Sequence, residues 1–361
     1  MVIKPKKVMG GIWLGTSVLL MTTVISVTSA LALLIIGLNE QGIWSEQQET
    51  LQGSVQLTQA QYAARLLHLP SWSSDLPADL AASLSNISHE IINGVEVDVA
   101  TVTVKQTNGL FSVSQQQDIV RFPLLLNIPP AGLILVNGIT NGASFTLYLP
   151  SSTAHPVYSY SLWANQVIDL SQGTRVSCDP LIIDKTHCLG SVLSQSALKN
   201  TDIKDNDSYL PLDALDYLFG THIDDISDDT LKAIPWQITT SCTSLDPYAL
   251  FIWVEGSCIL SDVEEIGSPA QPIILIIENG DIVLKDEAKI YGLVVSLQKT
   301  SLFSQQVIMH DSSIIEGSLI LNHSATSNSD IQVKYDYPLL LKLQQMPQLQ
   351  QLARVPGSRK R

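Results

Sequence analysis

The chain has 361 residues, of which 45% are hydrophobic and only 15% are charged. This composition excludes wholesale disorder, because it supplies enough apolar side chains for a packed core. The formal charge of −14 excludes a nucleic-acid-binding role, since a phosphate backbone requires a positive protein face.

The N-terminal segment combines a basic flank with a long apolar run. Lys4, Lys6 and Lys7 precede an uncharged stretch of 28 residues from Gly11 to Leu38. As a helix this stretch would be about 42 Å long, more than the hydrocarbon core of a bilayer requires. The lysines should stay on the cytoplasmic side, so we expect a single-pass membrane protein with an exported head. A cleaved secretory signal is the alternative, although its apolar region is usually only about 7–15 residues long.

The same flank resembles the start of type IV prepilins, in which basic residues and a glycine precede a long uncharged helix. The resemblance implies cleavage by a prepilin peptidase at Gly10-Gly11, with the helix retained on the mature protein. This chain departs from the major pilins, which carry a Glu five residues after the cut, because Leu14, Gly15 and Thr16 stand in that neighbourhood. A subunit cut here would lack the carboxylate that neutralises a neighbour's N-terminal amine.

The helical pattern continues beyond the apolar run and then gives way to strands. A loose apolar stripe ends at Leu69, before Pro70, and a linker follows over residues 70–89. From Glu90 the period changes to two: VEVDVATVTVKQ alternates strictly between Asn-Gly turn signals. We therefore predict a strand-rich module over residues 90–199.

The second half contains an acidic segment and a repeated strand. Residues 200–238 are acidic and helix-forming. The segments IYGLVVSLQ and IIEGSLILN then place Gly292 and Gly317 25 residues apart, close to one coil of a single-stranded β-solenoid. An ordinary β-sandwich edge is the alternative. We favour a solenoid-like module over residues 239–336.

The predicted fold is mainly β with a long N-terminal α-helix, a strand-rich head, a small acidic helical insert and a solenoid-like C-terminal part. The expected segments are a basic leader over residues 1–10, a transmembrane and extended helix over 11–69, a linker over 70–89, strands over 90–199, the acidic helical segment over 200–238, the solenoid-like module over 239–336, and a C-terminal helix with a basic tail over 337–361.

Four cysteines in an exported chain predict two disulfides. They are Cys178, Cys188, Cys242 and Cys258. Three pairings are open, and we favour the sequential one because it closes short loops. A metal site is the alternative, but the chain has no C-x-x-C motif.

Acidic side chains raise two further hypotheses. Hard oxygen ligands for Ca²⁺ are present at Asp205, Asp207, Asp224 and Asp225, but neither group has the glycine and terminal glutamate of an EF-hand loop. A glycosidase would need two carboxyls at a fixed separation, for which the candidates are Asp281, Asp286, Glu287 and Glu316. Solvated turns and faces are the simpler interpretation, so we expect no catalytic residue, no cofactor and no metal.

Two tryptophans lie within expected strands. We expect Trp163 and Trp253 to pack in the core with each indole N–H bonded to backbone, rather than to form a platform for sugars.

From Ser159 onward the order of landmarks resembles PilX-type pilus assembly proteins. The matching parts are SYSLWANQVIDLSQGTRVSC, SYLPLDALDYLFG, the block from Cys242 through WVEG to YGLV at 291–294, and the end from KYD at 334–336 to VPGS at 355–358. The resemblance covers roughly residues 159–358. The family tail continues with Trp and an acidic residue, whereas Arg359, Lys360 and Arg361 end this chain.

The resemblance implies a minor, pilin-like subunit of a type IV pilus system that helps to prime assembly or cap the tip. It implies a bacterial inner-membrane location with the head in the periplasm, and other minor pilins, a tip adhesin and a prepilin peptidase as partners. A tethered periplasmic module that binds polysaccharide or a partner protein is the alternative, and a polysaccharide-active enzyme is the less favoured third hypothesis.

Overall fold

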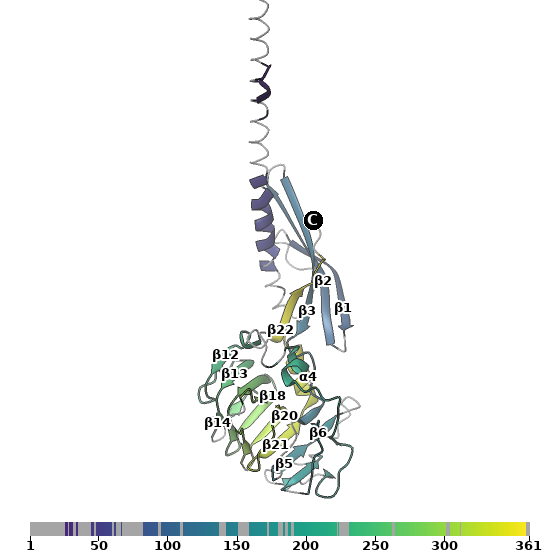
Figure 1. Cartoon of the computed structure of the whole chain (residues 1–361), viewed down its shortest axis with the longest axis vertical. Coiled ribbons are helices and arrows are strands. Elements are labelled where there is room, and N and C mark those ends of the chain that lie inside the picture. Colours follow the sequence, from purple (N-terminus) through teal and green to yellow (C-terminus); the bar gives the residue numbers. More distant parts are fainter. Residues whose placement is uncertain are drawn as a thin grey trace, which may run out of the picture.

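The protein is described by a computed structural model that is mostly β, with 45% strand and 17% helix. Figure 1 shows a globular head and, joined to it, a smaller part that we call the stem, in which the helical residues 48–59 lie beside the strands 82–92, 95–108, 111–123 and 350–354. The described residues are 26–27, 29–31, 34, 45–46, 48–59, 61–62, 66, 82–92, 95–108, 111–136, 142–150, 159–171, 173–179, 183–184, 187–188, 191–221, 223, 231–261, 264–300, 304–310 and 312–358.

The prediction of a long N-terminal helix over residues 11–69 is wrong, and so is the single-pass inner-membrane location that depended on it. In the part of the chain that the structure describes, no helix has both the length and the apolar character to cross a bilayer. The helical residues 48–59 are amphipathic, because Leu51 and Val55 are buried whereas Glu49 and Gln56 are exposed. A helix with one apolar face packs on a sheet and does not suit a surrounding of lipid on all sides. Most of the apolar run 11–38 lies outside the described residues.

The stem contains a four-stranded antiparallel sheet in the order β1-β2-β3-β22. Its strands are β1 (Ala82–Ile92), β2 (Val95–Asn108), β3 (Phe111–Pro123) and β22 (Gln350–Arg354). Alternation along β2 places Ala100, Val102 and Val104 on one face, where they cluster with Val55 and Leu66 of the helical segment. One helix face and one sheet face therefore make a small core of their own (Figure 1).

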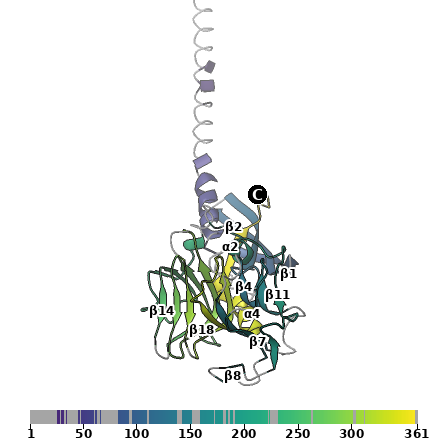
Figure 2. The same ribbon diagram turned by 60° about the horizontal axis from the view of Figure 1, so that its bottom comes forward.

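The head is a β-solenoid whose strands belong to one 16-stranded assembly, paired in parallel except at β10. One row of neighbours runs β12-β13-β16-β18-β20-β4-β6-β11, and a second runs β14-β17-β19-β21-β5-β7-β10. Figure 2 shows strands of the head lying side by side, with β14 and β18 labelled among them. The strands are β4 (Ala131–Leu135), β5 (Ser144–Tyr148), β6 (Tyr160–Ala164), β7 (Arg175–Cys178), β10 (Val192–Ser194), β11 (Ile203–Lys204), β12 (Gln237–Thr239), β13 (Phe251–Glu255), β14 (Cys258–Leu260), β15 (Glu265–Ile266), β16 (Ile273–Glu278), β17 (Ile282–Leu284), β18 (Lys289–Leu297), β19 (Val307–Met309), β20 (Ile314–Leu321) and β21 (Asp330–Tyr335). A short hairpin of β8 (Ile183–Asp184) and β9 (His187–Cys188) stands apart.

The two glycines of the sequence repeat are neighbours in adjacent coils. Gly292 pairs with Gly317 in the parallel register of β18 and β20. Both have positive φ, of 142° and 134°. A Cβ atom would lie 1.9 Å from the carbonyl oxygen of Ile273 at Gly292, and 2.0 Å from that of Gly292 at Gly317. Only glycine therefore permits this corner of the solenoid, where the backbones of successive coils approach closely.

The first strands of the solenoid in chain order, β4 and β5, lie in its middle and not at one of its ends. Strands β4 to β11 extend from β20 toward one end, the segment 205–236 connects to β12 at the other end, and β13 to β20 then wind back. The two halves meet where β20 pairs with β4 and β21 pairs with β5. The chain thus leaves the solenoid close to where it enters: the Tyr335 hydroxyl donates to the Pro129 carbonyl at 2.9 Å. This closure allows β22 to pair with β3.

Two apolar layers stabilise the head. One fills the solenoid, and the other lies between its first row of strands and the segments that cover them. Those covering segments include α2 (Ala214–Phe219), α4 (Tyr337–Gln345) and the 3₁₀ helix η1 (Pro347–Leu349). Because both faces are covered, strands such as β16 (IILIIE) read as continuous apolar runs and do not alternate.

The solenoid is larger than the sequence predicted. The strand-rich segment 90–199 divides between the antiparallel sheet of the stem and the coils from β4 to β10. The solenoid therefore includes residues 131–204 as well as 237–335. At the C-terminus, α4 ends at Gln345 and the strand β22 follows.

Candidate functional site

The structure contains the two disulfides in the favoured sequential pairing. Cys178 is bonded to Cys188, and Cys242 is bonded to Cys258. They lie near opposite ends of the solenoid, since Cys178 ends β7 and Cys242 follows the terminal strand β12. An end coil has a neighbour on one side only, so a covalent link there replaces part of the missing stacking.

The Ca²⁺ candidates are only partly described. Asp205 accepts the Ile168 backbone N–H at 2.8 Å and forms an ion pair with Lys199. Asp207 accepts from the Trp163 indole and pairs with Lys204 at 2.6 Å. Asp224 and Asp225 lie outside the described residues. Among the residues that are described, no group of three or more His, Cys, Asp or Glu side chains could hold a metal ion.

The acids considered for glycoside cleavage have separate local environments. Glu316 forms an ion pair with Lys334 at 2.8 Å on adjacent strands. Asp281 accepts the Gln306 backbone N–H at 2.8 Å between coils. Asp286 and Glu287 both have positive φ in the turn between β17 and β18. An ion pair explains the environment of Glu316, a backbone hydrogen bond explains that of Asp281, and turn geometry explains those of Asp286 and Glu287.

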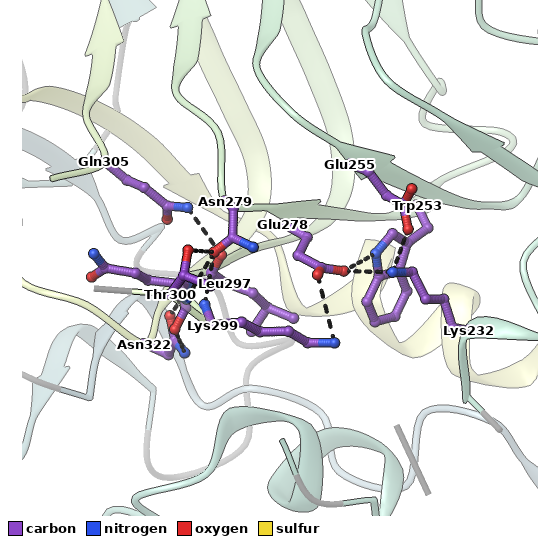
Figure 3. Close-up of polar contacts among 11 residues, drawn as sticks. Lys232, Trp253, Glu255, Glu278, Asn279, Leu297, Lys299, Thr300, Gln305 and Asn322 are labelled. Carbon is purple, nitrogen blue, oxygen red and sulfur yellow. Dashed lines mark hydrogen bonds and ion pairs between the residues drawn. The ribbon is translucent and has the colours of Figure 1, made fainter. Parts of the chain in front are cut away.

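Trp253 lies at the centre of a charged cluster, shown in Figure 3. Its indole N–H donates to a Glu278 carboxylate oxygen at 2.8 Å, and the Lys232 ammonium reaches the same oxygen at 2.9 Å. Lys232 also pairs with Glu255, and Lys299 lies 3.7 Å from the other oxygen of Glu278. The two ammonium groups are 5.4 and 5.7 Å from the centroid of the Trp253 ring. The indole therefore bonds to a carboxylate, not to backbone as expected from the sequence.

The electrostatics of this cluster favour the ionised carboxylate. Burial, the largest single influence, would raise the pKa of Glu278, but hydrogen bonds from Lys232 and Trp253 together with the charges of Lys299 and Lys232 lower it. Trp253 is completely buried, so its ring has no face for a ligand. The cluster fixes the ends of β13 and β16 and is structural.

A similar cluster surrounds Trp163 near the other end of the same row of strands. The Trp163 indole donates to Asp207 at 2.7 Å, and the Lys204 ammonium lies 5.3 Å from the ring centroid. Burial would raise the pKa of Asp207, but the bonds from Lys204, Trp163 and Tyr209 lower it. Each tryptophan thus has one carboxylate on its N–H and a lysine over its ring.

Asparagines join the coils beside the Trp253 cluster. The Asn279 side-chain oxygen accepts from the backbone N–H groups of Lys299 and Thr300 at 2.9 and 3.1 Å (Figure 3). Asn322 repeats the pattern one coil further on and accepts the Gln298 N–H at 2.6 Å. These bonds satisfy backbone N–H groups in the segment that follows β18.

A cleft of about 560 Å³ lies between the antiparallel sheet of the stem and the head. His89, Asp98 and Arg121, which are neighbours in the register of β1, β2 and β3, line one side. Asp98 accepts from the Arg121 Nε at 2.8 Å and contacts the His89 ring nitrogen through its other oxygen. These side chains belong to the same sheet face as Ala100 and Val102. That face is apolar where the helical segment covers it and polar where it borders the cleft.

The opposite side of the cleft comes from α4, η1 and the loop after β3. Tyr337, Gln344 and Gln345 lie on α4, and Gln350 begins β22. The Gln344 amide donates to the Leu125 carbonyl at 2.9 Å, and the Gln350 amide donates to the Gln344 carbonyl at 2.9 Å. These bonds hold both side chains in fixed positions.

The sequence contained a signal for part of this cleft that its interpretation missed. In VEVDVATVTV the charged positions 96 and 98 have the parity of the apolar positions 100, 102 and 104. A carboxylate on the core-facing side of a strand indicates either a partner or a site. Arg121, the partner of Asp98, lies on β3, the strand that follows β2 in the chain and pairs with it, so a local pattern could have suggested this contact. Gln345 and Tyr337, on the other side of the cleft, are more than 200 positions away from Asp98 in the sequence, and no local pattern could have placed them there.

Exposed apolar side chains mark the described helical positions that precede the stem. Val27, Leu31 and Leu34 are 57%, 53% and 60% exposed. Their spacing of four and three residues places them on one helix face. The predicted cleavage residues Gly10 and Gly11 lie outside the described residues.

Comparison with known proteins gave no relative: no family model, no curated protein and no solved structure matches this chain.

Proposed function

We propose that the chain is a structural, minor-pilin-like subunit that takes part in the assembly or tip priming of a type IV pilus. The resemblance of residues 159–358 to PilX-type assembly proteins motivates the proposal. The observation that carries it is the change along the helical residues: Val27, Leu31 and Leu34 are exposed, whereas Leu51 and Val55 are buried on the sheet.

Exposed apolar side chains on one helix face are stabilised when another apolar surface covers them. In a filament, the helices of neighbouring subunits would provide that surface. The position of the head suits a domain held away from the helical segment. It is inserted in the chain between β3 and β22, so both of its connections pass through the antiparallel sheet of the stem. The partners in this proposal are other minor pilins and a tip adhesin, and a prepilin peptidase would process the N-terminus.

No catalytic step is part of the proposal. The described carboxylates at the best candidate positions are held by lysines or by backbone N–H groups. An ion pair or a backbone hydrogen bond stabilises a carboxylate in a folded protein and needs no substrate.

The test is filament formation in cells that lack the gene. Surface filaments are counted after complementation with the natural chain, with Leu31→Glu, and with the matched control Leu198→Glu, whose residue is 48% exposed on the head. We expect the natural chain and Leu198→Glu to restore filaments, and Leu31→Glu to reduce their number at least about tenfold, because an unpaired charge would be buried in an apolar contact. Full restoration by Leu31→Glu, or unchanged filament numbers on deletion, would contradict the proposal.

A further inference from the structure

The cleft between stem and head has the size and lining of a ligand site. Its volume of about 560 Å³ lies within the roughly 300–1,000 Å³ of small-molecule sites. Its residues come from three separate parts of the chain: the hairpin strands β1 to β3, the loop after β3, and the segment from α4 to Gln350. The cleft therefore exists only when the solenoid has closed and β22 has paired with β3.

The ionisable groups on the sheet side are His89, Asp98 and Arg121, which contact one another, and Glu96, which is exposed. Asp98 contacts both Arg121 and His89. The Arg121 side chain is 7% exposed and that of Asp98 is 18% exposed, whereas His89 is 69% exposed. The sheet side thus offers oriented donors and acceptors, a paired Arg121–Asp98 couple and the exposed carboxylate of Glu96. An anionic ligand is repelled by that carboxylate, whereas the hydroxyl groups of a neutral ligand can donate to it.

The helix side offers uncharged polar groups beside small apolar patches. The amide nitrogens of Gln344 and Gln350 donate to backbone carbonyls, which leaves their side-chain oxygens as acceptors of fixed direction. Tyr337 adds an aromatic ring, and Pro123 and Pro347 add apolar surface. Fixed amides and an aromatic ring match a ligand that carries hydroxyl groups on an apolar ring skeleton.

We propose that this cleft binds a short, uncharged oligosaccharide. His89 and Gln345, which are both exposed, contact its hydroxyl groups, and Tyr337 and Pro347 cover its carbon–hydrogen face. An apolar peptide helix is a less suitable ligand, because it would remove water from the Arg121–Asp98 pair without offering hydrogen bonds in exchange. A metal ion is disfavoured, because no described group of three metal-binding side chains exists. The proposal is independent of the role in filament assembly, since the cleft uses none of the exposed helical positions.

The test is titration of the full chain with defined probes: maltotriose, cellotriose and tri-N-acetylchitotriose, with trigalacturonate as the charged control. Binding is followed by saturation-transfer NMR and calorimetry. We expect at least one neutral probe to bind with a Kd of about 1 mM or tighter. Trigalacturonate should bind at least about tenfold more weakly than that probe.

Variants locate the binding. Gln345→Ala removes an exposed amide that lines the cleft, and Gln348→Ala removes a nearby exposed amide that does not line it. We expect Gln345→Ala to weaken the neutral probe at least about fivefold, Gln345→Trp to abolish binding by filling the space, and Gln348→Ala to have no effect. Melting temperatures of all three variants verify that each is folded.

Four results would overturn the proposal: no neutral probe binds at 10 mM, the charged probe binds equally well, both alanine variants lose binding alike, or Gln345→Trp still binds. Binding of an unrelated polar peptide in place of every saccharide would assign the cleft to a protein partner and also reject the saccharide. Filament counts for Gln345→Trp separate the two functions, because we expect them to be unchanged.

Discussion

The antiparallel sheet of the stem and the solenoid of the head solve the burial problem in different ways. In the stem, β1, β2 and β3 are neighbours both in the chain and in the sheet, β22 alone comes from far along the chain, and one helix face covers one sheet face. In the head, β20 pairs with β4 across more than 180 positions, and the first row of strands is covered on both faces. The core of the stem therefore depends on the helical segment that covers one face of its sheet, whereas the core of the head depends on the close stacking of coils that are distant in sequence.

The largest effect is expected at the glycine corner of the solenoid. Gly317→Ala would place a Cβ 2.0 Å from the Gly292 carbonyl oxygen at a φ of 134°, so a coil must move. We expect a loss of at least about 4 kcal/mol in unfolding free energy, measured in urea by circular dichroism. Gly53→Ala in the stem is the control, since nothing lies within 4 Å of its Cβ, and it should stabilise by roughly 0.5–1 kcal/mol. Equal changes in unfolding free energy for Gly317→Ala and Gly53→Ala would contradict the proposed difference between the tightly stacked head and the stem.

The second prediction tests whether the stem opens by itself. Leu66 is 1% exposed in the small core, and Leu66→Ala should cost about 2–5 kcal/mol there. Hydrogen exchange should show faster exchange in β1 to β3 and unchanged protection in β16 and β18. Leu57→Ala, at a position 60% exposed on the same helical segment, should leave both regions unchanged. Equal loss of protection in both regions would show that stem and head unfold as one unit.

The third prediction concerns the ends of the solenoid. Replacing Cys242 and Cys258 by alanine opens a loop with a sequence separation of 16 and should cost about 3 kcal/mol. The corresponding change at Cys178 and Cys188, with a separation of 10, should cost slightly less. Denaturant unfolding of both double variants gives the comparison. A negligible effect at both ends would mean that stacking alone holds the terminal coils.

The smallest effect is a pH dependence inside the solenoid. Burial lowers the pKa of His323, against the smaller opposing influence of the Ser324 carbonyl and the charge of Asp281. Its Nδ1 faces the Ser324 carbonyl at 3.1 Å and therefore carries the proton, so Nε2 accepts from the Ser296 hydroxyl at 2.8 Å.

Because the pKa of His323 is lower in the folded chain, protonation favours unfolding. Its contribution to stability is complete above the ordinary pKa of 6.5 and decreases as the pH falls from there toward the lowered pKa of the folded state. The slope is at most about 1.4 kcal/mol per pH unit. Urea unfolding between pH 7.5 and 5 should show a shallower slope for His323→Gln than for the natural chain, and identical slopes would refute the assignment.

Local patterns predicted much of the chemistry of the head. The repeat around Gly292 and Gly317 predicted stacked coils, and the short cysteine spacings favoured the pairing that is observed. The tryptophans were correctly placed in packed strands, but their carboxylate partners were missed. Asp207 and Glu278 come from neighbouring strands or loops, and strand periodicity does not specify which side chains adjacent coils bring together.

The N-terminal prediction assigned residues 11–69 to one long helix without asking which surface covers the apolar stripe that ends at Leu69. Residues 48–59 have an apolar stripe that a sheet can cover, and the sheet is formed by strands from both ends of the chain. The strand β22 was expected to be tail, since QQLAR has no apolar alternation of its own. β22 pairs with β3 because the chain leaves the solenoid at Tyr335, close to Pro129, where it entered.

The sequence by itself determined strands with clear alternation or with a repeated apolar pattern, such as β2 and the pair around Gly292 and Gly317, and which cysteines are near one another, because these depend on propensity and short separations. Only the tertiary structure decided that the solenoid closes in its middle, that β22 completes the antiparallel sheet of the stem, and that a polar cleft lies between stem and head. Those features depend on burial between segments far apart in the chain, and no local pattern encodes which distant surfaces will meet.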